Sequence, residues 1–207
     1  PSIGDNEKLT EIKEDEYKNV WIKSGKGLLG RYNSEEGKFE DFSAKFNVPI
    51  DAIKPKGKEI WVVSTTGVLQ RYKNQEIEIV ANIPNLNGID NKVSSIEFVN
   101  KQELYISTTK GKIYSFSNVT KRLKELIGPF TDYPTHVLLK TDNSNRLWIG
   151  TETGLLIYDL HKESFIHNNF FKNSPYNLSN RIFTTLFLDK EDNIWAGTDG
   201  DGLYKIN

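Results

Sequence analysis

Short runs of alternating apolar and polar residues, separated by turns that contain Gly, cover most of this 207-residue chain. The clearest example lies at residues 145–159, where the runs 146–150 and 155–158 have the period of two β-strands. Thr153-Gly154 between the two runs has the composition of a tight turn. The pattern therefore predicts a β-hairpin.

The same hairpin recurs five times, and its first strand carries an aromatic residue at intervals of 40 to 47 residues. A repeat of about 40 to 50 residues is typical of the blades of a β-propeller, each of which is a four-stranded antiparallel sheet. The aromatic residues that mark the five copies are Trp21, Trp61, Tyr105, Trp148 and Trp195.

Each hairpin is preceded by an apolar strand with a polar turn, and the first four are followed by a further strand. The predicted strand order in a blade is therefore A–B–C–D, with a Gly turn between strands B and C. No stretch keeps a helical period, so helices should be nearly absent. The expected turn glycines are Gly25, Gly67, Gly111, Gly154 and Gly200, and the expected blades are 8–42, 50–80, 93–127, 135–167 and 182–207, the last without its outer strand.

We therefore expect an all-β fold in which residues 1–207 form one partial β-propeller domain of about five blades. Two arrangements remain open. Residues 1–6 could donate the missing outer strand and close a five-bladed ring, or the chain could be an arc of a larger, seven-bladed propeller. The unpaired ends favour the arc. The chain begins at Pro1 and contains no Met, and we expect it to be part of a longer polypeptide.

Composition excludes several kinds of protein. Lys and Arg number 27 against 28 Asp and Glu, so the net charge of −1 does not favour nucleic acid as a partner. The longest apolar runs fall far short of the roughly 20 residues of a membrane-spanning helix. With no Cys, the chain has no disulfide, zinc–thiolate site or Cys nucleophile.

Residues 177–204 resemble the repeat of the two-component regulator propeller family. They combine Leu178-Ser179, an apolar strand, Asn193-Ile194-Trp195-Ala196-Gly197-Thr198 and Gly202-Leu203-Tyr204. Residues 146–159 resemble it closely, and 59–72 and 19–32 loosely, whereas 103–116 diverge most because Tyr105 replaces Trp.

The resemblance implies the extracytoplasmic sensor region of a hybrid two-component system of Bacteroidetes, placed in the periplasm and followed in the parent chain by a histidine kinase. It implies a non-catalytic module that recognises an oligosaccharide derived from a glycan. The expected partners are that ligand, the remaining blades and sensor modules of the parent chain, and a second copy in a homodimer. No cofactor and no metal are implied.

Several motifs have a structural interpretation. The four Trp occupy one repeat position and should fill the core between blades rather than stack on sugars. Residues 24–27 lack the length and the following helix of a phosphate loop. Residues 199–202 lack the ligand spacing of a calcium loop and should form a turn. The three His lack metal-ligand spacing.

The candidate ligand site lies in the D–A connections, which with the B–C turns open on one face of a propeller. These loops combine aromatic rings, which can stack on a sugar, with polar groups that can bind its hydroxyls. The candidate ligand-binding residues are Asp132, Tyr133, His136, Tyr176 and Arg181.

Two other functions remain open. The propeller could be a protein–protein interaction or dimerisation scaffold without a small ligand. It could also be a glycan lyase or hydrolase, because a catalytic carboxylate pair is joined by geometry and leaves no sequence motif.

Overall fold

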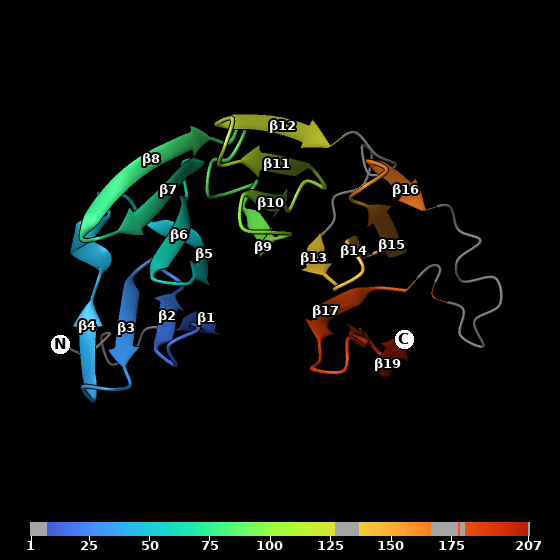
Figure 1. The fold of residues 1–207 in the computed structure, drawn as a ribbon, viewed down its shortest axis with the longest axis horizontal. Coiled ribbons are helices and arrows are strands. Elements are labelled where there is room, and N and C mark those ends of the chain that lie inside the picture. Colours follow the sequence, from blue (N-terminus) through green and yellow to red (C-terminus); the bar gives the residue numbers. More distant parts are fainter. Residues whose placement is uncertain (1–7, 127–136, 167–177, 179–180, 207) are drawn as a thin grey trace. The chain divides into compact units, whose positions relative to one another are not determined.

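A computed structural model describes residues 8–126, 137–166, 178 and 181–206, and these residues form five antiparallel sheets (Figure 1). The described residues contain no α-helix, and their one helical element is the 3-10 turn η1 (Ser43–Lys45). Among them no helix is long and apolar enough to cross a membrane. The predicted all-β fold of about five blades is confirmed.

The chain divides into two compact units, and the first, Pro1–Val93, contains the first two blades. Within a blade every strand pairs with its neighbour in sequence, as the A–B–C–D order predicts. Blade 1 consists of β1 (Leu9–Glu14), β2 (Val20–Ser24), β3 (Leu29–Asn33) and β4 (Lys38–Asp41), and blade 2 of β5 (Ile50–Lys56), β6 (Glu59–Ser64), β7 (Val68–Lys73) and β8 (Glu76–Asn82).

The second unit, Ser94–Asn207, contains the other three blades apart from the first residue of β9. The fifth blade has three strands among the described residues, where β19 pairs with β18 and no fourth strand pairs with β19. Blade 3 consists of β9 (Val93–Phe98), β10 (Glu103–Thr108), β11 (Ile113–Ser117) and β12 (Arg122–Leu126); blade 4 of β13 (Leu138–Thr141), β14 (Arg146–Thr151), β15 (Gly154–Asp159) and β16 (Ser164–Ile166); and blade 5 of β17 (Phe183–Leu188), β18 (Ile194–Thr198) and β19 (Leu203–Ile206).

The second strand of each blade is the most deeply buried. In β6, β10 and β14 the last five residues are all buried, so both faces of these strands are covered. The outer strands β4 and β12 instead contain only exposed and half-buried residues. This explains why the second strands are almost continuously apolar, whereas the outer strands are rich in charge.

Two of the repeat Trp residues, Trp21 and Trp148, fill the space between neighbouring sheets, as the sequence predicts. Trp21 packs in a core cluster with Phe46 and Ile53, which belong to the segment leading into blade 2 and to β5. Trp148 packs likewise against Phe183 of β17 and is 1% exposed. Burial of rings of this size is a main source of propeller stability.

A hydroxyl side chain closes every B–C turn. It stands three residues after the repeat aromatic, where its oxygen binds backbone groups of the turn. The Oγ of Ser64 accepts from the amide of Val68 at 3.0 Å, and Thr151 donates to the carbonyl of Gly154 at 2.8 Å. The five hydroxyl residues are Ser24, Ser64, Thr108, Thr151 and Thr198.

The B–C turn of blade 1 contains Gly25, as expected, but the glycine at the repeat position of Gly67 is Gly27. The amide of Gly27 donates to the carbonyl of Ser24, as Gly67 does to Ser64 in blade 2. Gly27 has φ +81°, and a Cβ there would come within 2.5 Å of the amide nitrogen of Ile50. Only Gly permits both the backbone conformation and this close approach of the next blade.

A carboxylate organises the A–B turn in three of the blades, and it is buried in blades 1 and 4. In blade 4, Asp142 accepts from the backbone amides of Ser144 and Arg146 at 2.9 and 3.0 Å. Its other oxygen accepts from the indole Nε1 of Trp148, six residues later, at 2.7 Å. Asp15 with Trp21 and Asp189 with Trp195 repeat this arrangement. The carboxylate thus satisfies both the turn and the buried indole donor.

Candidate functional site

The predicted loop site falls mostly on residues that the structure does not describe. Asp132, Tyr133, His136 and Tyr176 lie outside the described residues. Arg181 is described, and its guanidinium binds the carboxylate of Asp201 in the B–C turn of blade 5. It also lies 5.4 Å from the ring centroid of Tyr204, and the hydrogen bond to Asp201 raises the pKa of Arg181.

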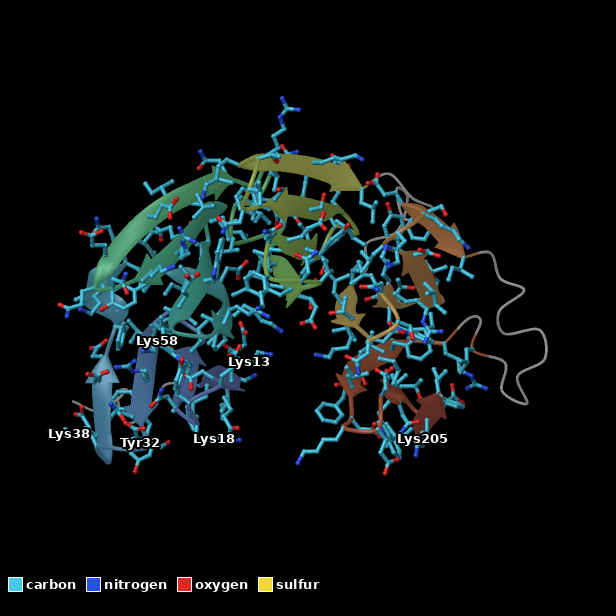
Figure 2. The ribbon with its side chains drawn as sticks, in the orientation of Figure 1. Lys13, Lys18, Tyr32, Lys38, Lys58 and Lys205 are labelled. Atoms are coloured by element: carbon cyan, nitrogen blue, oxygen red, sulfur yellow. The ribbon has the colours of Figure 1, made fainter. Side chains whose placement is uncertain are left out.

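The described residues contain a pocket of about 410 Å³ within the first unit. We call it the turn pocket because the β1–β2, β3–β4 and β5–β6 turns line it, together with the adjoining ends of β2, β3 and β6. Figure 2 labels Lys58, which belongs to the β5–β6 turn. The lining residues are Asp15, Tyr17, Asn19, Trp21, Arg31, Asn33, Glu35, Gly57, Lys58 and Glu59.

The inner wall of the turn pocket is held by mutual contacts. Asp15 accepts from Trp21 Nε1 at 3.0 Å and from the side chain and amide of Asn19. Burial acts to raise the pKa of Asp15, but these hydrogen bonds outweigh it and hold the pKa below its usual range. The guanidinium of Arg31 lies 5.4 Å from the Trp21 ring centroid and donates from Nε to Glu40 at 2.9 Å.

The rim of the turn pocket is more open. Tyr17 is 47% exposed, and the ammonium of Lys58 lies 5.8 Å from the centroid of its ring. Glu35 is exposed at the β3–β4 turn. The amide of Gly57 donates to the carboxylate of Glu16 at 3.2 Å and so joins the two A–B turns. Aromatic, cationic and anionic groups therefore meet at one rim.

Sequence reasoning missed the turn pocket because it placed the site at the other ends of the strands. The D–A and B–C connections leave an antiparallel blade at one end, whereas the A–B and C–D turns that line this pocket leave it at the opposite end. The Asp-to-Trp spacing of six residues, at Asp15 and Trp21, was the available signal for its inner wall. No sequence signal joins Tyr17 to Lys58.

A second polar cluster lies between blades 1 and 2, where Lys23 occupies the repeat position of Gly150. Lys23 is 6% exposed, and its Nζ lies 3.8 Å from Glu11 of β1. Asp51 of β5 accepts from the amide of Val93 at 2.6 Å. Burial raises the pKa of both Glu11 and Asp51, although the charge of Lys23 acts in the opposite direction.

The described part of the chain contains no group of three His, Asp or Glu side chains placed to hold a metal ion. Residues 24–27 and 199–202 form B–C turns, with Gly27 donating to Ser24 and Thr198 donating to Gly202. The interpretation of both segments as turns is therefore confirmed.

Comparison with known proteins supports the resemblance seen in the sequence. The family model described as "Two component regulator propeller" matches residues 177–200. A search of curated proteins finds no significant relative.

Solved structures share the fold at low identity. The extracellular domain of a hybrid two component system from B. thetaiotaomicron superposes with a TM-score of 0.75 at 20% identity, covering 100% of this chain and 28% of that one. The extracellular domain of a one component system from the same organism superposes with a TM-score of 0.73 at 22% identity, covering 99% of this chain and 28% of that one. PorZ, a surface component of the type-IX secretion system of Porphyromonas gingivalis, superposes with a TM-score of 0.65 at 16% identity, covering 96% of this chain and 32% of that one.

The chain thus spans less than a third of the length of these structures. The structural likeness confirms that the blades of this chain are propeller blades. The low coverage of the neighbouring structures is consistent with a fragment of a larger propeller. The family named from the sequence is confirmed for the matched residues. Residues 177–200 match the two component regulator propeller repeat.

Proposed function

We propose that this chain is a non-catalytic ligand-recognition segment of the sensor of a hybrid two-component regulator. The observation that carries the proposal is the match of residues 177–200 to the two component regulator propeller family. The fold likeness to extracellular domains of such systems supports it. The parent protein would hold this segment in the periplasm and carry a histidine kinase beyond the inner membrane.

The proposed ligand is an oligosaccharide derived from a glycan. The proposed site is the loop set that contains Asp132, Tyr133, His136, Tyr176 and Arg181. Its two Tyr rings would stack on the sugar, and its polar side chains would bind the hydroxyls. Binding would bias the kinase by favouring one of two states of the sensor.

Calorimetric titration of the 207-residue chain with a panel of defined neutral oligosaccharides tests the proposal. We expect heat with at least one member, lost in Tyr133→Ala and Tyr176→Ala. Tyr32→Ala is the matched control, since Tyr32 of β3 is 42% exposed and belongs to no D–A loop. In the intact parent protein the same oligosaccharide should change the rate of autophosphorylation.

Two results would contradict the proposal. A flat titration across the panel would favour the protein–protein scaffold. The appearance of new reducing ends would show glycan cleavage and would favour the lyase or hydrolase.

A further inference from the structure

We propose that the turn pocket is a second binding site, which accepts a small uncharged polyhydroxylated molecule of the size of a monosaccharide or disaccharide. The pocket is separate from the D–A loop site, because its walls come from A–B and C–D turns. The inference therefore stands or falls independently of the proposed function.

The size of the turn pocket suits a small ligand. Its volume of about 410 Å³ lies in the range of roughly 300 to 1,000 Å³ that is usual for such sites. Its walls come from two blades of the same compact unit. A ligand would therefore contact blade 1 and blade 2 together.

The inner wall is set before any ligand arrives. The carboxylate of Asp15 is occupied by the indole of Trp21 and by Asn19, and these groups fix its position. The guanidinium of Arg31 lies against the rings of Trp21 and Phe42, at 5.4 and 5.2 Å from their centroids, and is held by Glu40. A wall fixed in this way costs little conformational entropy when a ligand binds.

The rim supplies the groups that would hold a polyol. Among the described residues, Lys58 has no carboxylate partner, so its ammonium can donate to hydroxyl oxygens. Glu35 has no ion-pair partner there either, and its carboxylate can accept from two neighbouring hydroxyls. The half-exposed ring of Tyr17 offers an apolar face for the C–H side of a sugar ring.

The charges of the turn pocket argue against an anionic ligand. Three carboxylates line it, from Asp15, Glu35 and Glu59, against the two cations of Arg31 and Lys58. Arg31 is in addition paired with Glu40, outside the lining. No excess of positive charge remains to attract a phosphate or sulfate group.

Chemical-shift titration of the ¹⁵N-labelled 207-residue chain tests the inference. The neutral probes are glucose, maltose and cellobiose, and the anionic probe is inorganic phosphate. We expect at least one neutral probe to shift the indole Nε1–H of Trp21 and the amide of Gly57, with a Kd of about 10 mM or tighter. Tyr17→Ala and Lys58→Ala should each raise that Kd about fivefold or more.

The controls are an exposed Tyr and an exposed Lys of blade 1. Tyr32→Ala and Lys38→Ala should change the Kd by less than about twofold, since neither residue lines the pocket. Figure 2 labels both residues and Lys58. All four substituted side chains are exposed, so the variants should fold.

Three results would overturn the inference. The first is that no neutral probe shifts the Trp21 indole at about 50 mM. The second is that the shifts survive both Tyr17→Ala and Lys58→Ala. The third is that phosphate binds more tightly than every sugar. Shifts that persist in Tyr133→Ala and Tyr176→Ala, while the calorimetric heat is lost, would show that the two sites are distinct.

Discussion

Removal of the Asp142 carboxylate should destabilise blade 4 strongly. This side chain is 0% exposed and accepts hydrogen bonds from Trp148, from the amides of Ser144 and Arg146, and from the Arg146 side chain at 2.6 Å. In Asp142→Ala the indole N–H of Trp148 loses its acceptor. Trp148 is 1% exposed, so water has little access to replace that acceptor.

The magnitude follows from these contacts. A buried donor left without an acceptor costs about 1 to 3 kcal/mol. Breaking a buried ion pair by removing one partner costs about 3 to 5 kcal/mol, but Arg146 is 23% exposed and recovers part of this from solvent. We therefore expect Asp142→Ala to lower the free energy of unfolding by about 3 kcal/mol.

Two variants separate the causes. Asp142→Asn keeps the shape of the side chain and one acceptor oxygen, so it should lower the free energy of unfolding by less than Asp142→Ala does. Asp189→Ala removes the equivalent contacts of Trp195, but Trp195 is only half-buried and water can replace the lost acceptor. Asp189→Ala should therefore lower the free energy of unfolding by less than Asp142→Ala does.

Urea unfolding followed by Trp fluorescence, with hydrogen exchange of the Trp148 indole as a local measure, tests this prediction. Equal losses in Asp142→Ala and Asp189→Ala would refute the reasoning, because burial of the indole would then not set the cost. An unchanged exchange rate for the Trp148 indole would refute it as well.

Two further predictions concern the interface between blades. Gly150→Val should destabilise the chain by about 1 to 3 kcal/mol in urea unfolding, because even a Cβ there would lie 3.1 Å from the Cβ of Phe183. Val63 occupies the equivalent position of blade 2. If Gly150→Val lowered the free energy of unfolding by less than about 0.5 kcal/mol, blade 4 would have room for the Val side chain as well. Burial raises the pKa of Glu11 and Asp51, so the folded state binds their protons more tightly than the unfolded chain does. The contribution of these two groups to the free energy of unfolding should therefore fall as the pH rises from the ordinary carboxylate pKa of about 4 through the raised values. In Glu11→Gln the free energy of unfolding should decline less than in the wild type over this window, and an equal decline in both proteins would contradict the assigned direction.

The blades were predictable because their signal is local and repeated. The aromatic residue, the hydroxyl three positions later and the turn glycine all lie within one hairpin, as at Trp61, Ser64 and Gly67. The B–C turn of blade 1 contains two glycines, and of these only Gly27 stands at the repeat distance from Trp21 with a positive φ.

The turn pocket was not predictable in the same way. Tyr17 and Lys58 are non-repeating residues in the turns of different blades, and they meet only because those blades are neighbours. Their pairing depends on packing, which leaves no period in the sequence. Of the predicted loop site, only Arg181 lies in the described residues, and it binds Asp201 of its own blade. The assignment of that loop site stays a prediction.

The bond from Asp142 to the Trp148 indole spans six residues, so both partners belong to one blade and no neighbouring blade is needed to satisfy this buried donor. A duplicated repeat would therefore carry its polar requirements with it, and only its apolar faces would have to match a new neighbour. Matching apolar surfaces tolerates substitution of similar volume far better than matching buried hydrogen bonds does. Such a repeat can be added to an array or diverge within it at little risk to the fold, which leaves the turns free to vary.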